Sequence, residues 1–69
     1  MIKFKLGESE YIELIKLLKL LNISNSGGQA KLMVEDGEVK LNGKIESRKR
    51  AKLRTGDKIE VFDKIIEIE

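Results

Sequence analysis

The residues with the clearest chemical potential are the lysine and arginine side chains between positions 40 and 54. Only one acidic residue, Glu46, lies in that window, and the seven basic residues give it a charge of +6. The other 54 residues hold seven basic and eleven acidic side chains and sum to −4. Such segregation places a positive patch on an acidic body, which attracts and orients polyanions. The seven cations are Lys40, Lys44, Arg48, Lys49, Arg50, Lys52 and Arg54.

The spacing of these cations suggests how they would be displayed. From Arg48 to Arg54, every second residue is basic. Residues two apart in a strand point to the same side, so we expect this stripe on one face, at intervals of about 6.6 Å. The same alternation predicts that Lys40 and Lys44 face outward on a neighbouring hairpin. The alternative is a charged strand edge that only resists aggregation. Because single-sign patches usually serve steering, and arginine forks suit phosphate, we favour polyanion binding.

Catalytic chemistry has few candidate residues in this chain. Histidine and cysteine are both absent, which removes the commonest general base, the thiolate nucleophile and the commonest transition-metal ligands. Asp36 and Glu38 flank a turn glycine and are too few to enclose a hard cation. We therefore expect no enzyme, no metal, no cofactor and no small-molecule substrate. The lack of cysteine fits a cytoplasmic setting, and no apolar stretch is long enough for a membrane span.

Apolar spacing predicts the N-terminal elements. Alternation favours a strand over residues 2–6. Eight of the eleven residues from Tyr11 to Leu21 are apolar, which predicts a core helix with a narrow polar stripe, capped by Ser9 and stopped by Asn22. Ser26 and Gln29 have the spacing of a capping box, in which each side chain bonds to the amide of the other. They would start a second helix that runs to about residue 35, with its inward side chains at Ala30, Met33 and Val34.

The remaining residues predict strands. Asn42-Gly43 between alternating runs is a strong signal for a hairpin with a type I′ turn. Ala51 and Leu53 share one face of the next stretch, and a last hairpin spans residues 59–68. The order is a strand, two helices and four strands. We therefore expect one small α+β domain over residues 1–69, with two N-terminal helices packed on a mostly antiparallel sheet of about five short strands.

Three sequences, in this order, resemble a known family. Ser26–Lys31, Asp36–Lys44 and Gly56–Val61 are similar to the RNA-binding domain named for ribosomal small-subunit protein S4, also called the α-L motif. Its members show a capped helix, a Gly-x-Val-x-(Val/Leu)-Asn-Gly hairpin and a Gly-Asp turn in that order. The run Glu46–Arg50 is most similar to short bacterial members that consist of this domain alone. The resemblance implies a monomer that grips structured RNA, ribosomal or transfer RNA, with its second helix and the adjacent hairpin.

The resemblance also implies particular contacts. By position these are Lys31, Lys40, Lys44, Arg48 and Arg50. Many members carry arginine where this chain has Gly27. Gly27 and Gly28 either offer bare amides at a helix N-terminus as a phosphate contact, or permit close packing. Together with the charge pattern, the expected RNA-binding set is Lys31, Lys40, Lys44, Arg48, Lys49, Arg50, Lys52 and Arg54.

Two other classes of function are alternatives to RNA binding, and the few aromatic residues bear on how RNA would be recognised. The apolar face of helix 11–21 would suit a protein-interaction module, whose complexes would not respond steeply to salt. A sulfur carrier or ubiquitin-like modifier would need a Gly-Gly tail, whereas this sequence ends in Ile-Glu-Ile-Glu. Phe4 and Tyr11 fall at expected core positions, so base stacking is poorly supplied. Recognition of RNA shape and backbone therefore fits better.

Overall fold

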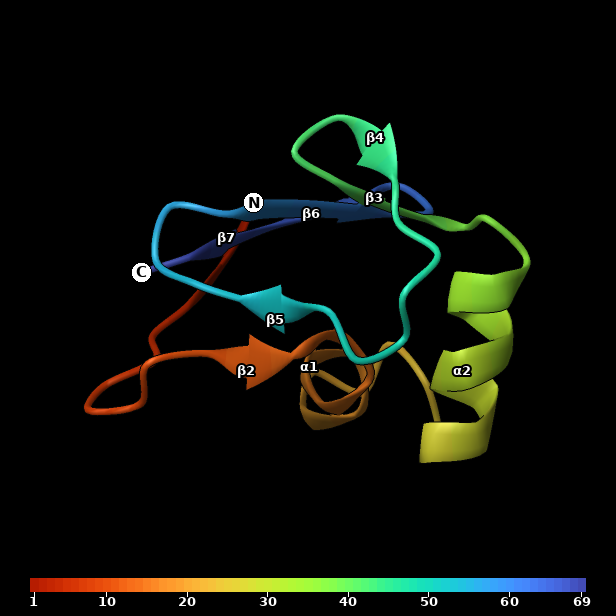
Figure 1. Ribbon diagram of the computed structural model, residues 1–69, viewed down its shortest axis with the longest axis horizontal. Helices are drawn as coiled ribbons and strands as arrows, with labels where there is room; N and C mark the ends of the chain where they lie inside the picture. Colours follow the sequence, from red (N-terminus) through yellow and green to blue (C-terminus); the bar gives the residue numbers. More distant parts are fainter.

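The computed structural model describes residues 1–69, and its layers can be followed in Figure 1. A five-stranded sheet, seen edge-on, lies on one side, and α1 and a short two-stranded ribbon lie beneath it. Helix α2 stands at one end, and the C-terminus lies toward the other. The elements are β1 (Ile2–Phe4), β2 (Ile12–Glu13), α1 (Leu14–Leu20), α2 (Gly27–Glu35), β3 (Val39–Leu41), β4 (Lys44–Ile45), β5 (Lys52–Leu53), β6 (Lys58–Val61) and β7 (Lys64–Ile68).

The main sheet has the strand order β1-β7-β6-β3-β4. Strand β1 pairs with β7 in parallel, and every other neighbouring pair is antiparallel. This confirms the predicted small α+β domain with two helices and a mostly antiparallel sheet of five strands. The sequence did not predict the separate antiparallel ribbon of β2 and β5. Neither helix has the length and apolar content that crossing a bilayer requires.

The core fills the space between the sheet and the helices. Strand alternation sends one face of β3, β6 and β7 inward, and the helices meet it with their apolar faces. The side chains predicted to face inward from α2 are all buried. The core consists of Ile12, Leu14, Leu17, Leu18, Ala30, Met33, Val34, Val39, Ala51, Leu53, Ile59, Val61, Ile66 and Ile68.

The first helix is shorter than its apolar run predicted. The segment before Leu14 is extended, and Ile12 pairs with Leu53 across the β2–β5 ribbon. Ser9 does not cap the helix, because the N-cap position is Glu13 and no side chain caps it. Instead the Leu14 amide donates to the Ala51 carbonyl (2.9 Å) and the Ile15 amide to the Lys49 carbonyl (3.1 Å). The basic segment therefore supplies the acceptors that the first turn of α1 needs.

The predicted C-terminal end of α1 is confirmed, and the predicted start and end of α2 are largely confirmed. Asn22 adopts a positive φ of 57° just after α1, a conformation that ends helices. At the start of α2 the Gln29 amide donates to Ser26 Oγ (3.1 Å). The reciprocal half of the capping box differs from the prediction, since the Gln29 side-chain oxygen accepts from the Asn25 amide rather than from Ser26. Gly37, with a φ of 76°, provides the predicted exit.

The Asn-Gly turn is confirmed and also joins two parts of the fold. Asn42 and Gly43 both have positive φ, 52° and 88°, as a type I′ turn requires. The Asn42 side chain accepts from the Lys58 amide (2.9 Å) and donates to the Asp57 carboxylate (3.1 Å). The Asp57 carboxylate in turn accepts from the Arg54 amide (2.8 Å). These bonds tie the β3–β4 hairpin to the Gly-Asp turn before β6.

Candidate nucleic-acid interface

The basic segment is a loop with a turn, not one extended strand. Between β4 and β5 the chain leaves the main sheet and turns at Lys49 and Arg50, where the Ala51 amide donates to the Arg48 carbonyl (3.1 Å). The extended ribbon resumes only at Lys52 and Leu53. The prediction of a single stripe from Arg48 to Arg54 is therefore wrong. The physical reason is that the carbonyls of Lys49 and Ala51 are drawn onto the N-terminus of α1.

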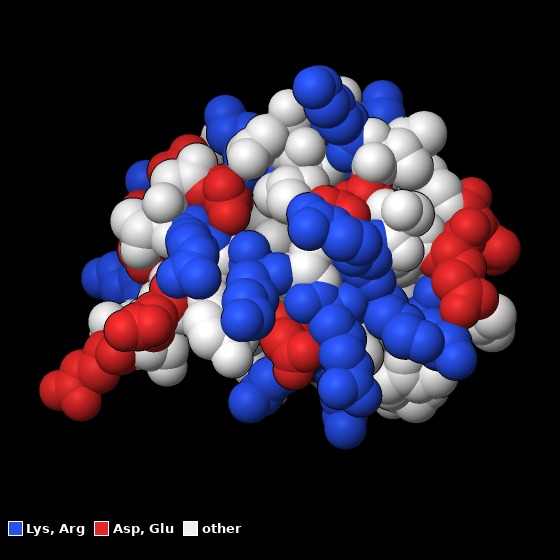
Figure 2. Space-filling model, viewed as in Figure 1, with Lys and Arg blue, Asp and Glu red and all other residues white.

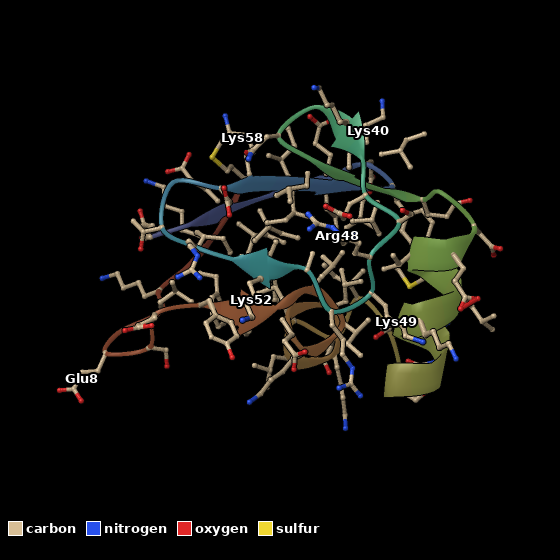
Figure 3. The ribbon with its side chains drawn as sticks, viewed as in Figure 1. Glu8, Lys40, Arg48, Lys49, Lys52 and Lys58 are labelled. Carbon is tan, nitrogen blue, oxygen red and sulfur yellow. The ribbon has the colours of Figure 1, made fainter.

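The two lysines of the β3–β4 hairpin do not share a face. Lys40 pairs with Ile45, and Lys44 pairs with Leu41. Directly paired residues lie on the same face of an antiparallel ladder, and consecutive residues alternate. Lys40 and Lys44 therefore lie on opposite faces, contrary to the prediction. Figure 3 shows Lys40 and Lys58 on the outer side of the sheet, away from Lys49 and Lys52.

Arg48 is held by the one acidic residue of the basic segment. Glu46 is only 9% exposed. Its carboxylate accepts hydrogen bonds from the Arg48 amide (2.9 Å), from Arg48 Nε (3.0 Å) and from Arg48 Nη2 (3.1 Å). The hydrogen bonds from the Arg48 side chain are the main cause that lowers the pKa of Glu46. The guanidinium keeps a solvent-facing side, since the Arg48 side chain is 75% exposed, so Glu46 fixes its direction without covering it.

Lys49 lies against α2, where it meets another lysine. Figure 3 shows its side chain beside that helix. The close approach of the Lys31 ammonium is the main cause that lowers the pKa of Lys49, and Arg50 adds a smaller effect in the same direction. Glu35 acts in the opposite direction. The fold thus brings like charges from α2 and the loop together.

Arg50 lines a hollow between the two helices. The hollow has a volume of about 380 Å³, and its other lining residues include Lys16 and Lys19 from α1 and Gly27 at the start of α2. Both lysines belong to the narrow polar stripe that the sequence predicts on the first helix. Their spacing of three residues was a signal that they share a face, but only the tertiary structure places that face beside Arg50.

The surroundings of Gly27 and Gly28 test whether close packing requires glycine at these positions. A Cβ atom built on Gly27 would meet nothing within 4 Å, and one on Gly28 would meet only Ser26 Oγ, at 3.8 Å. Neither residue has a positive φ. Close packing therefore does not account for Gly27 or Gly28. A phosphate contact at the amides of these residues stays a prediction.

Tyr11 is not a core residue, contrary to the prediction. It precedes β2 and is 39% exposed. Lys52 Nζ lies 4.9 Å from the centroid of its ring, and Arg54 Cζ lies 5.6 Å from the same point. These are distances of cation–π contacts.

Most of the basic residues between positions 40 and 54 lack an acidic partner. Of the seven basic residues between positions 40 and 54, only Arg48 forms an ion pair, and the other ion pairs of the molecule join Lys3 to Glu69 and Lys64 to Asp63. In Figure 2, blue side chains gather across the middle and lower part of the visible face, with most red side chains toward the sides. We use the term basic surface for Lys16, Lys19, Lys31, Lys49, Arg50, Lys52 and Arg54.

Comparisons with known proteins agree with this architecture. A family model described as S4 domain matches residues 4–69. YbcJ of Escherichia coli (strain K12) is 44% identical over 59 residues, which cover 86% of this chain and 84% of YbcJ. RlbA of Bacillus subtilis (strain 168), named a probable ribosome maturation protein, is 37% identical over 54 residues, 78% of this chain and 76% of RlbA.

A solved structure extends the similarity to nearly the whole chain. The solution structure of E. coli YbcJ has a TM-score of 0.74 and 38% identity, and the match covers 99% of this chain and 86% of that one. YbcJ was described as having an α-L motif involved in RNA binding. The chain belongs to the S4 domain family, which confirms the resemblance seen in the sequence.

Proposed function

We propose that this protein is a non-catalytic RNA-binding module and that the basic surface is its RNA contact. The observation that carries the proposal is the convergence of cations from α1, α2, the loop and β5, with Lys49 against Lys31 and no ion pair on any of them. Gathering like charges costs free energy in the free protein, and a bound polyanion removes that cost.

The relatives support RNA as the polyanion. YbcJ was described as having a motif involved in RNA binding, and RlbA is named a probable ribosome maturation protein. The chain spans 84% and 76% of these two proteins. We therefore propose structured RNA as the ligand, ribosomal RNA first and transfer RNA second, bound by a monomer in the cytoplasm.

Within this proposal the residues have different roles. The hollow formed by Lys16, Lys19 and Arg50 with the amides of Gly27 and Gly28 would hold a phosphate, because helix N-termini bind anions. Lys31 and Lys49 would neutralise the next phosphates along the backbone. Arg48, Lys44, Lys52 and Arg54 extend the contact along the loop and its flanking strands. Lys40 contributes least, because it lies on the outer sheet face opposite Glu60.

A charge-matched pair of variants tests the proposal. The first replaces Lys31, Lys49 and Arg50 by serine. The second replaces Lys3, Lys5 and Lys64 by serine; these residues lie on or beside β1 and β7, the two strands farthest from β4 in the sheet order. Both lose the same net charge. We expect the first to weaken binding of a labelled ribosomal RNA hairpin at least tenfold, about 1.4 kcal/mol, and the second by no more than about twofold, as fluorescence anisotropy would measure. Equal losses would mean that net charge alone drives binding, and no loss in the first would place the site elsewhere.

A further inference from the structure

We propose that the hollow beside Tyr11 binds the base of an unpaired nucleotide, with the Tyr11 ring as stacking surface and Lys52 and Arg54 as contacts for the adjacent phosphates. The proposal rests on the proposed function and adds what the module would recognise. A purely backbone-reading surface binds duplex and single strand alike, whereas this site requires a base that is free to leave its stack.

The β2–β5 ribbon explains how the ring and the cations come to share one face. Ile12 pairs with Leu53, and both side chains are buried. By alternation, the residues on either side of this pair point outward. Continuing the register places Tyr11 opposite Arg54, with Lys52 two residues along on the same face. The distances of 4.9 Å and 5.6 Å from the ring centroid to Lys52 Nζ and Arg54 Cζ agree with this geometry.

The hollow has the size and lining that a base needs. Its volume is about 360 Å³, at the lower end of the range for small-ligand pockets. Phe4, Leu6 and Leu20 supply apolar walls, and Leu20 is 55% exposed although it belongs to a core helix. Ser9 and Glu13 add a hydroxyl and a carboxylate, groups that hydrogen bond to the edge of a base. A flat aromatic ligand with polar edges fits this mixture better than a purely apolar one.

The hollow is also continuous with the basic surface. Lys16 and Glu13 line both this hollow and the one that contains Arg50 and Gly27. An RNA strand held by phosphate contacts at Arg50 would therefore pass Lys16 on its way to Tyr11. Neither Lys52 nor Arg54 forms an ion pair with a carboxylate. Both cations remain available to phosphate beside a stacked base, and an arginine plane can itself stack. This charge favours a nucleotide over an apolar peptide as the occupant.

The protein carries its own probe for this site. Tyr11 is the one tyrosine and there is no tryptophan, so intrinsic emission excited within the tyrosine absorption band, on the side where phenylalanine does not absorb, reports on this ring. We expect a short single-stranded RNA to quench the emission strongly, after correction for RNA absorbance, because a base would stack on the ring. A blunt duplex of the same sequence should bind the basic surface and leave the emission nearly unchanged.

Two substitutions complete the test, with affinities measured by anisotropy of labelled RNA. Tyr11→Leu should weaken binding of the single strand about tenfold, within the range of base–aromatic stacking, and change duplex binding by no more than about twofold. Tyr11→Phe keeps the ring and should bind like the wild type. Circular dichroism would verify that both variants fold. If Tyr11→Leu does not fold, the quenching of wild-type emission by single-stranded RNA still tests the base site.

The outcomes separate the base site from RNA binding in general. Single-stranded RNA that binds without quenching would overturn the base site and leave the proposed function standing. Equal weakening of single strand and duplex by Tyr11→Leu would also overturn it, since the ring would then serve only to support Lys52 and Arg54. If neither RNA binds the wild-type protein, the proposed function fails and the base site fails with it.

Discussion

Glu46 is an acidic residue that holds the basic segment in place. In the sequence it is the lone acid of a cationic segment. In the structure it is nearly buried, its carboxylate accepts three hydrogen bonds from Arg48, and its amide donates to the Val39 carbonyl (2.9 Å). A buried carboxylate is tolerated when it is paired and hydrogen bonded. Glu46 therefore anchors the start of the basic loop to β3 and aims Arg48 at solvent.

The lowered pKa of Glu46 predicts a pH dependence of stability. Because its folded-state pKa lies below the ordinary value of 4.5, the ionised carboxylate stabilises the fold at pH values above 4.5, and this contribution is lost as the pH falls through the lowered pKa. Glu46→Gln should therefore be less stable at pH 7 and lose less free energy of unfolding between pH 5 and pH 3. Urea denaturation followed by circular dichroism measures both effects.

Glu8→Gln is the matched control for that prediction. Figure 3 shows Glu8 extending away from the body of the molecule, and it forms no ion pair. Its stability curve should follow that of the wild type across the same pH range. If Glu46→Gln also follows the wild type, the carboxylate does not hold the loop.

The two helices obtain their N-terminal hydrogen bonds in different ways. Helix α2 is capped locally by Ser26 and Gln29. Helix α1 has no side-chain cap and depends on the Lys49 and Ala51 carbonyls, more than 30 residues away in the chain. The second arrangement couples the basic loop to the core helix. These long-range hydrogen bonds keep Lys49 and Arg50 near α2, and the residues next to them in the sequence do not predict this placement.

The cap of α2 can be tested directly. Ser26→Ala removes the acceptor for the Gln29 amide and should lower the free energy of unfolding by about 1 kcal/mol, the usual value of an N-cap. Ser26→Asp retains an acceptor at the same position and should lose little. Chemical denaturation of the three proteins gives the comparison. Equal stability of the alanine and aspartate variants would mean that the Ser26 side chain does not stabilise the helix.

At the scale of the whole molecule, the distribution of charge matters more than its sum. The net charge is only +2, yet the basic surface draws cations from four separate segments. Salt-dependent release of counterions measures how many phosphates such a surface neutralises. The paired lysines elsewhere, Lys3 with Glu69 and Lys64 with Asp63, should contribute little to that number.

We expect a double-logarithmic salt slope near about −3 for irregular or single-stranded RNA, as about four neutralised phosphates would give. The variant without Lys31, Lys49 and Arg50 should have a slope flatter by about 2, since each lost phosphate contact removes about 0.7. The variant without Lys3, Lys5 and Lys64 should keep the wild-type slope. Anisotropy titrations at several salt concentrations provide the measurement. A flat wild-type response would exclude binding through phosphates.

Some of this protein follows from short stretches of sequence alone. The Asn42-Gly43 turn, the Ser26 cap and the strand alternation at Ile59, Val61, Ile66 and Ile68 all depend on neighbours within a few residues. Backbone sterics and side-chain period act at that range, so these features could be predicted. The composition likewise identified the segment that carries the cations.

Other features exist only in the tertiary structure. Residues 11–13 have an apolar pattern that fits a helix, but pairing with β5 makes them extended and turns Tyr11 outward. The carbonyls of Lys49 and Ala51 bend the basic segment onto α1, so that Arg50 meets Lys16 and Lys19 and its neighbour Lys49 meets Lys31. Hydrogen-bonding groups without local partners must find distant ones when they are buried. That requirement acts between segments far apart in the chain, and it decided which cations and which ring share a surface.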